Sequence, residues 1–303
     1  MLAELFAAAG IVTGSWQIDP PLPVARSEVA GAAWRGDVVV AGGFLADGHS
    51  SLRVDAYNPR VKRWERLPDL PLAVNHAMAA AGGARLYVVG GYGASGPLRD
   101  AFVLDGPRWR RLPSMPFARA AGGAVVLGHT LYVAGGVGPF GVARSLLAYD
   151  LRRKRWRALP GPRPREHLGV TVLRGRLYVA GGRATGRLFS IVQVWSPAER
   201  RWRRVSSLPE ARGGTAAGSA GGMVISAGAE SSAGTSAAVF AYSPAANRWR
   251  QLADLPTPRH GLAVVGIAST VHVVGGGPQP GLSVSAANES LDVGASPRTR
   301  VRR

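Results

Sequence analysis

The chain has 303 residues, including 41 glycines and 22 prolines, and 46% of its residues are hydrophobic. This content of turn-forming residues excludes a helical bundle, and the apolar content excludes a disordered chain. The sequence contains no cysteine, which excludes disulfides, thiolate metal sites and thiol nucleophiles.

The charge of the chain is strongly positive. Lys and Arg number 37 against 18 Asp and Glu, giving a formal net charge of +19. All the basic residues except Lys62 and Lys154 are arginines, a usage typical of a GC-rich, bacterial genome. Such a charge favours solubility and non-specific attraction of anions, but it identifies neither fold nor function.

The two ends of the chain are expected to be tails. Residues 1–14 are apolar but carry Glu4 and no basic residue, which is unlike a signal peptide. We therefore expect a cytoplasmic protein, or an exported one if the true start lies upstream. Residues 295–303 are basic and are expected to be a disordered tail. No apolar run reaches the ~20 residues of a membrane helix, so we expect no membrane span.

A tryptophan recurs along the chain at intervals of 45 to 48 residues. The six members are Trp16, Trp64, Trp109, Trp156, Trp202 and Trp249. A period of this length suits a repeated unit of four short strands with their turns. We expect these tryptophans to be packing residues, because burying so large a side chain is strongly favourable.

A pair of glycines recurs with the same period, each time after an apolar run such as Leu86–Val89. The pairs are Gly42 and Gly43, Gly90 and Gly91, Gly135 and Gly136, Gly181 and Gly182, and Gly275 and Gly276, and the fifth repeat has a degenerate copy at Gly228 and Ala229. The apolar run predicts a strand covered on both faces. The glycines at its end permit a tight turn and a close approach of another backbone.

Each unit is predicted to contain four strands in a fixed order. In five units the first strand begins at an arginine, and the second strand ends at the glycine doublet. The second residue of the doublet stands 17 residues after this arginine. After a variable loop, an apolar third strand ends in a turn such as Tyr57–Pro59, where Asn, Asp or Ser bonds to nearby backbone. The fourth strand carries the tryptophan and ends at Leu-Pro, as at Leu67 and Pro68, because proline suits a strand end.

This pattern resembles the kelch repeat over roughly residues 15–294. The glycine doublet, the tyrosine before it, the Tyr-Asp turn and the tryptophan strand all match that family. The resemblance implies an all-β protein, namely a six-bladed β-propeller of four-stranded blades in a single domain, residues 15–294.

The ends of the array predict how the ring closes. The last unit stops before any tryptophan strand, whereas Trp16–Pro23 precedes the first unit. We therefore expect the N-terminal strand to complete the sixth blade, which removes an open sheet edge. Asp19 stands where other repeats have Leu or Val, so this strand is expected to pair less firmly. His272 replaces a repeat tyrosine and is expected to be a core residue.

A ligand is expected on the face made by two kinds of connection, from the fourth strand to the next blade and from the second strand to the third. The repeat arginines begin the first strands and should ring the opening there: Arg26, Arg119, Arg165, Arg212 and Arg259. With Asn75, His76, His167 and His260 nearby, such a ring would suit an anionic ligand, because guanidinium offers paired donors to a carboxylate. The alternative is that each arginine belongs to the repeat and bonds backbone carbonyls or an acidic neighbour.

Variable loops after the glycine doublets lie on the same face. They are residues 44–49, 92–100, 137–144, 183–187, 230–234 and 277–279. Loops on a rigid scaffold commonly carry recognition, so Tyr92, Arg183 and Glu230 are further candidates for ligand binding. Glu28, Glu166 and Glu230 could balance the positive charge.

No enzyme motif is present in the sequence. We therefore assign no catalytic residue, no metal ligand and no cofactor. Kelch propellers mostly bind proteins and some bind sugars, so the resemblance implies a non-catalytic scaffold that uses the arginine-ringed loop face. The expected partner is a protein, an anionic small ligand or a sugar, and we expect a monomer.

Two other functions are alternatives. By analogy of fold alone, one alternative is an enzyme similar to the bacterial sialic acid mutarotases (epimerases), which are single kelch propellers. Anomerisation needs a proton donor and acceptor within reach, and Glu230 or a histidine could supply them here. Copper chemistry of the galactose oxidase type is disfavoured, because its tyrosine–cysteine crosslink needs a cysteine. Arginine-dense turns at 152–157 and 200–204 would suit nucleic-acid phosphates. They follow the blade period, as charges on exposed edge strands do, so we expect no nucleic-acid partner.

Overall fold

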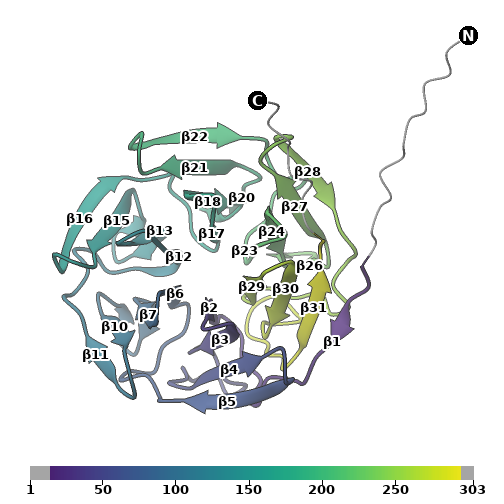
Figure 1. Ribbon diagram of the computed structural model, residues 1–303, viewed down its shortest axis with the longest axis horizontal. Helices are drawn as coiled ribbons and strands as arrows, with labels where there is room; N and C mark the ends of the chain where they lie inside the picture. The colour runs from purple at the N-terminus through teal and green to yellow at the C-terminus, as the bar shows by residue number, and fades with distance from the viewer. Residues whose placement is uncertain (1–13, 295–303) are drawn as a thin grey trace, which may run out of the picture.

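The computed structural model describes residues 14–294, which form six antiparallel sheets around a central opening (Figure 1). This arrangement confirms the six-bladed, all-β propeller expected from the sequence. Within residues 14–294 no helix has the length and apolar character needed to cross a membrane. The tails expected at 1–14 and 295–303 lie, apart from Gly14, outside the described residues.

Each blade is a four-stranded meander that runs outward from the central opening (Figure 1). The first, innermost strands are β2 (Ala30–Trp34), β6 (Met78–Gly82), β12 (Ala120–Leu127), β17 (Gly169–Leu173), β23 (Ala216–Ala220) and β29 (Ala263–Ile267). The second strands are β3 (Asp37–Ala41), β7 (Arg85–Val89), β13 (Thr130–Gly138), β18 (Arg176–Ala180), β24 (Met223–Ala227) and β30 (Thr270–Val274).

The outer half of each blade lies toward the rim. The third strands are β4 (Val54–Asn58), β10 (Ala101–Leu104), β15 (Ser145–Asp150), β21 (Val192–Ser196), β27 (Val239–Ser243) and β31 (Asn288–Asp292). The fourth strands are β5 (Arg63–Leu67), β11 (Trp109–Arg111), β16 (Arg155–Pro160), β22 (Arg201–Val205), β28 (Arg248–Gln251) and, for the last blade, β1 (Gln17–Ile18).

The loops between the second and third strands contain short pairings of their own. These are β8 (Tyr92–Gly93) with β9 (Gly96–Pro97), β14 (Gly141–Val142) with β13, β19 (Arg183–Ala184) with β20 (Arg187–Leu188), and β25 (Glu230–Ser231) with β26 (Gly234–Thr235). Four of the variable loops are therefore small hairpins with a defined conformation.

The ring is closed by the N-terminal strand, as the sequence predicted. Strand β1 pairs antiparallel with β31, so that Gln17 lies opposite Ser290 and Ile18 opposite Glu289. The last sheet thus combines the two ends of the propeller (Figure 1). A closed ring has no free blade edge at its junction.

The hydrophobic core is divided among the junctions between neighbouring blades. Six clusters of buried residues occur, one at each junction, including the junction between the last blade and the first. Between the first two blades, for example, Val39 and Val54 pack with Leu86 and Val88. Apolar burial of this kind stabilises by roughly 25 cal/mol per Å², so each blade depends on both of its neighbours.

The repeat tryptophans join the blades at the rim, in keeping with the packing role expected for them. Each indole Nε1–H donates to a backbone carbonyl near the end of the preceding blade, over 2.7 to 3.0 Å. The pairs are Trp16 with Ala253, Trp64 with Pro20, Trp109 with Pro68, Trp156 with Pro113, Trp202 with Pro160 and Trp249 with Ser206.

The glycine doublets join the blades nearer the axis. The backbone N–H of the second doublet residue donates to a backbone carbonyl of the next blade. The acceptor is the residue at the repeat-arginine position, so Gly91 donates to Arg119 and Gly136 donates to Arg165. A Cβ built on the first glycine would lie close to the same carbonyl oxygen, 2.2 Å away at Gly90. The doublet is therefore needed for close contact between blades.

Candidate functional site

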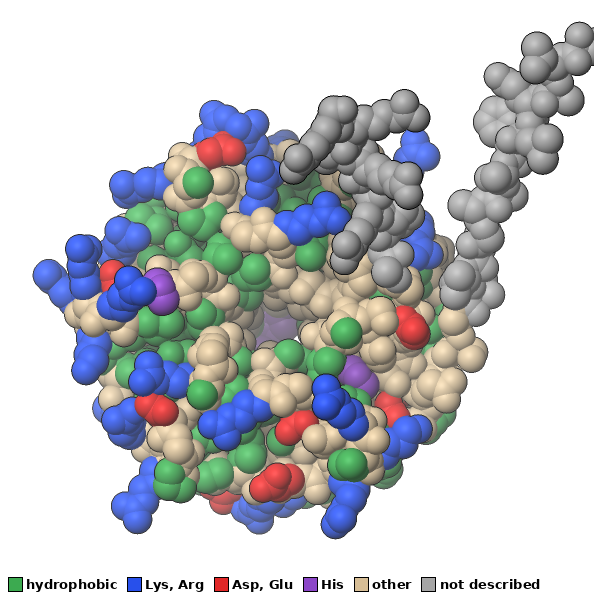
Figure 2. Space-filling model, in the orientation of Figure 1, with side chains coloured by type: hydrophobic (Ala, Val, Ile, Leu, Met, Phe, Trp, Pro, Cys, Tyr) green, Lys and Arg blue, Asp and Glu red, His purple; other side chains and the backbone are tan. Residues whose placement is uncertain are grey.

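The propeller has an axial channel lined by small side chains of the innermost strands. Two adjoining cavities of about 110 and 260 Å³ share lining residues from all six blades. The shared residues are Gly31, Ala79, Ala124, Val170, Ala217 and Val264. Figure 2 looks into this opening, and histidine is visible deep inside it. Most side chains of the channel lining are thus small and apolar, and the ionisable ones, Glu28, His76 and His167, lie at one mouth.

The five repeat arginines do not line this mouth, so the prediction that they ring the opening is wrong. Their side chains are buried inside the blades, with 0 to 2% of each residue exposed. Four of them donate to the carbonyl of the first doublet glycine of their own blade, and Arg212 donates to the carbonyl of Ala238. The four pairs are Arg26 with Gly42, Arg119 with Gly135, Arg165 with Gly181 and Arg259 with Gly275.

Buried carboxylates balance some of these guanidinium groups. Arg26 pairs with Asp55 over 2.5 Å, and Arg259 pairs with Glu289 over 2.7 Å. Burial lowers the pKa of Arg119 to about 10, which leaves it charged at neutral pH. The arginines therefore bond within five of the six blades, as the alternative interpretation of the sequence stated.

The residue two positions after each repeat arginine, or after Val74 in the second blade, lies at the channel mouth. These residues are Glu28, His76, Ala121, His167, Gly214 and Gly261, and all have φ between +50° and +67°. Their backbones form a chain of hydrogen bonds from blade to blade, such as His76 N–H to the carbonyl of Glu28 at 2.9 Å. We call this set the mouth ring.

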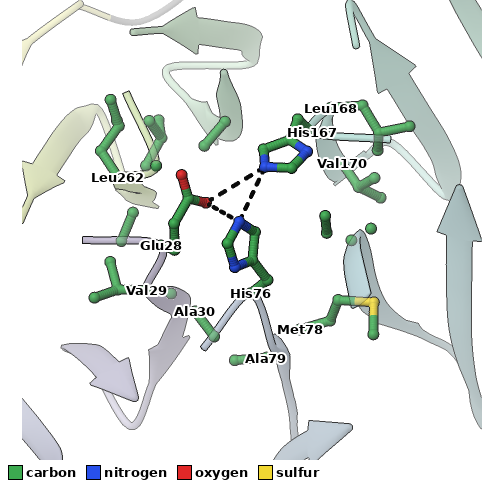
Figure 3. Close-up of a pocket in the computed structure, with 18 of the residues that line it drawn as sticks. Glu28, Val29, Ala30, His76, Met78, Ala79, His167, Leu168, Val170 and Leu262 are labelled. Carbon is green, nitrogen blue, oxygen red and sulfur yellow. Dashed lines mark hydrogen bonds and ion pairs between the residues drawn. The ribbon is translucent and has the colours of Figure 1, made fainter. Parts of the chain in front are cut away.

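Three side chains of the mouth ring point toward one another across the opening (Figure 3). The Nε2 atoms of His76 and His167 are 3.0 Å apart. Oε2 of Glu28 lies 3.2 Å from the first nitrogen and 3.8 Å from the second. Residues of three different blades thus bring three metal-ligating atoms within 4.8 Å of one another.

Both imidazole rings are held from behind by hydrogen-bond acceptors. Nδ1 of His76 lies 2.6 Å from Oδ1 of Asn75, and the amide nitrogen of Asn75 donates to Ser50 Oγ at 2.7 Å. Nδ1 of His167 contacts the carboxylate of Glu166. An acceptor faces each Nδ1, and this favours the tautomer in which Nδ1 carries the proton and the Nε2 lone pair faces the opening.

A second layer of charged groups surrounds this cluster. His260 Nδ1 lies 3.2 Å from Oε1 of Glu28 and 3.4 Å from Oε2 of Glu230. Arg183 bridges Glu166 at 2.9 Å and Glu230 at 2.6 Å. Each of the three carboxylates is therefore paired with a positive or imidazole group.

Burial and neighbouring charges set the ionisation of the site. Burial lowers the pKa of His76, and it lowers that of His167 to about 3, although Glu28 opposes both shifts. Burial alone would raise the pKa of Glu28, but His76, His260 and His167 together hold it well below its usual range. Burial opposes charge on His260 as well, yet Glu28 and Glu230 raise its pKa.

The formal charge of the site is negative. With His76 and His167 neutral, the carboxylates of Glu28, Glu166 and Glu230 outnumber the two cations, Arg183 and His260. With His260 counted as protonated, at least one negative charge is left in a poorly solvated space. This surplus favours a cation over the anionic ligand that the sequence suggested.

The structure brings together the other predicted ligand-binding residues. Asn75, His76, Tyr92, His167, Arg183, Glu230 and His260 all belong to this mouth, and the ring edge of Tyr92 packs against His76 with centroids 5.4 Å apart. Whether they bind a ligand stays a prediction. Sequence reasoning had given Glu28 only a charge-balancing role, although its place two residues after Arg26 is the same as that of His167 after Arg165.

Comparisons with known proteins agree with this architecture. Residues 108–276 match the KLHDC2/KLHL20/DRC7 Kelch-repeats domain, and residues 25–71 and 74–116 match the Kelch motif. The chain is similar to the Kelch-like protein terF of Aspergillus terreus, with 31% identity over 246 residues. That alignment covers 72% of this chain and 54% of terF, so the chain spans about half the length of this curated relative. The matched segments run through all six blades, and the chain belongs to the kelch-repeat family.

Proposed function

We propose that this kelch propeller is a non-catalytic scaffold that binds a protein partner through its loop face. We define the loop face as the connections between second and third strands together with those that lead from one blade to the next. The mouth ring lies on this face, because its residues stand in the connections between blades. Interaction with proteins is the general use of a kelch propeller, and the choice of face is our inference.

The observation that carries the proposal is the position of the exposed apolar side chains. Six large hydrophobic residues are exposed among the described residues, and four of them lie in loop-face connections: Leu52, Phe117, Phe140 and Leu282. Phe140 is fully exposed at the tip of a hairpin. Exposed aromatic and aliphatic side chains on one face favour a protein interface, where such residues supply much of the binding energy.

The loop face is also preorganised. Backbone bridges connect its loops to the mouth, including Ser27 with Phe44, Asn75 with Tyr92, and Glu166 with Arg183. A surface held in this way loses little conformational entropy when a partner binds. Rigid loops therefore support recognition by shape at this face.

An anionic small ligand or sugar has less support. The repeat arginines are buried, and Arg183 is already paired with two carboxylates. The mutarotase alternative needs a free acid–base group such as Glu230 or a histidine, and Glu230 is engaged by Arg183 and His260. We therefore propose a protein partner and no sugar chemistry.

Affinity capture with the full chain as bait tests the proposal. Phe140→Asp and Leu282→Asp should each deplete the captured partner at least tenfold, because a charge replaces an apolar contact. Val61→Asp is the matched control, since Val61 is 63% exposed but lies in the turn between β4 and β5, away from the loop face. Loss of the partner with Val61→Asp and retention with both loop-face variants would overturn the proposal.

A further inference from the structure

We propose that Glu28, His76 and His167 form a binding site for one divalent transition-metal ion, with Zn²⁺ as the reference ion. The site would lie at the mouth of the axial channel, where Figure 3 shows the three side chains converging. This inference goes beyond protein binding through the loop face and does not depend on it.

The first argument is the orientation of the lone pairs. Asn75 Oδ1 and the Glu166 carboxylate lie against the two Nδ1 atoms, where they can accept the Nδ1 protons, and in that tautomer each Nε2 presents a lone pair toward the other. A carboxylate oxygen of Glu28 faces the same point. Three acceptors converging on one point repel one another, and a cation between them turns the repulsion into attraction.

The second argument is distance. Zinc binds imidazole nitrogen at about 2.0–2.1 Å and carboxylate oxygen at about 2.0–2.2 Å, so tetrahedral ligand atoms stand roughly 3.3–3.5 Å apart. The corresponding separations here are 3.0, 3.2 and 3.8 Å. Shifts of about half an ångström, within the reach of side-chain rotation, would place all three atoms at bonding distance.

The third argument is the support behind each ligand. Metal-binding histidines commonly donate their other ring N–H to a carboxylate or carbonyl oxygen, which fixes the tautomer. Asn75 does this for His76 and is itself fixed by Ser50. Glu166 does it for His167 and is itself fixed by Arg183.

The surroundings suit a metal that keeps an open coordination position. Three protein ligands leave space for water or a further ligand. The cavity next to them has a volume of about 110 Å³, and Ala30, Ala79 and Val170 line it (Figure 3). Two imidazoles and one carboxylate favour Zn²⁺, Co²⁺, Fe²⁺ or Ni²⁺ over Mg²⁺ or Ca²⁺, which prefer oxygen ligands.

The test is a titration of the chelator-treated full chain with Zn²⁺, followed by calorimetry. We expect one ion per chain, and we expect His76→Ala and His167→Ala each to weaken binding by at least about 100-fold. His129→Ala is the matched control, because His129 is an exposed histidine in the turn between β12 and β13, and it should leave the affinity unchanged. Co²⁺ should give a ligand-field absorption band in the wild type that both ligand variants lose.

A supporting variant separates a metal site from a structural role. Asn75→Ala keeps all three ligands and should weaken Zn²⁺ binding by about 10- to 100-fold. Circular dichroism of each metal-free variant verifies folding, and Glu28→Gln, which preserves side-chain shape, replaces any alanine variant that unfolds. Absence of saturable Zn²⁺ binding by the folded wild type would overturn the proposal. Binding that survives in both histidine variants but disappears in His129→Ala would also overturn it.

Discussion

Buried ion pairs of a repeat arginine occur in two blades, Arg26 with Asp55 in the first and Arg259 with Glu289 in the closing blade. Arg259 is 0% exposed and Glu289 2%, and their side chains lie 2.7 Å apart. Removing one partner leaves an uncompensated buried charge, which typically costs about 3–5 kcal/mol. We expect Arg259→Met to lower the free energy of unfolding by about that amount in a urea titration.

A double substitution checks the cause of that loss. Arg259→Met together with Glu289→Leu removes both charges, so it should recover the part of the loss caused by the unpaired carboxylate. The part caused by the backbone carbonyls that Arg259 bonds, such as that of Gly275, should remain. If Arg259→Met alone cost under about 1 kcal/mol, the buried pair would not have the structural role described here.

The first glycine of a doublet is required for the contact between blades as well as for its backbone conformation. At Gly90, φ is +60° and an added Cβ would lie 2.2 Å from the carbonyl oxygen of Arg119. Gly106 also has a positive φ, but an added Cβ there would meet nothing within 4 Å. Gly90→Ala should therefore destabilise by about 2–4 kcal/mol and Gly106→Ala by only about 1 kcal/mol. If both variants lost the same amount of stability in thermal unfolding, the close contact between Gly90 and the carbonyl of Arg119 would have no role.

Individual residues also show what a sequence period can predict. The recurrence of Arg119 in step with Gly135 showed that the arginine belongs to the repeat, but a period carries no information about side-chain direction. The guanidinium turned out to bond the doublet carbonyl 16 residues later in its own blade. His76 and His167 were predicted singly, but the mouth ring as a set was missed because its six positions carry Glu, His, Ala and Gly and so share no single residue type.

At the scale of the strand, the two residues that depart from the repeat pattern, Asp19 and His272, lie near each other where the ring closes. Oδ2 of Asp19 lies 3.9 Å from Nδ1 of His272, and Oδ1 accepts from the hydroxyl of Tyr57 at 3.0 Å. Lys62 stands 3.8 Å from the same carboxylate. Asp19 is thus tied to the first blade, a contact that sequence comparison of single repeats could not reveal. His272 is buried, as expected for a core residue.

The burial of His272 predicts a pH effect on stability. Burial lowers its pKa, while Asp19 opposes the shift. A histidine with a lowered folded pKa contributes full stability above its unfolded value of about 6.5, and that stability is lost as the pH falls. His272→Tyr restores the repeat residue and should reduce the loss of unfolding free energy between neutral and mildly acidic pH. The prediction is wrong if the unfolding free energies of His272→Tyr and the wild type differ by the same amount at every pH.

The closing strand itself should contribute strongly to stability. Deleting residues 1–23 removes strand β1, the bond from Trp16 to Ala253 and the bond from Trp64 to Pro20. It also removes the buried side chain of Leu22. We expect the chain lacking residues 1–23 to melt at a much lower temperature than a chain lacking only residues 1–13. The difference between these two variants isolates the contribution of residues 14–23. Equal melting temperatures would mean that the ring does not depend on its closure.

At the scale of the whole molecule, the propeller follows from a period that several residue types share. Tryptophans at the rim and glycine doublets near the axis both form bonds between blades, so the repeat could be read from the sequence with its six blades and its closure. The site could not be read in this way, because it is assembled from different residues of several repeats meeting at the axis. Only the ring geometry brings Glu28, His76 and His167 together.

The distribution of charge fits this division between scaffold and site. Lys and Arg side chains surround the rim (Figure 2), and exposed turn residues such as Arg152 and Arg153 carry much of the positive charge. The channel mouth instead has a surplus of carboxylates. The rim charges suit solubility and resistance to edge-to-edge association, whereas our proposal places recognition on the loop face.

The most direct test of the assigned face is amide hydrogen exchange of the chain with and without its captured partner. The account predicts added protection in the loop-face segments 44–53, 92–100, 137–144 and 277–286, with unchanged exchange in the turns between third and fourth strands. Protection confined to those turns, such as 58–63 and 150–155, with none in the loop-face segments, would contradict it.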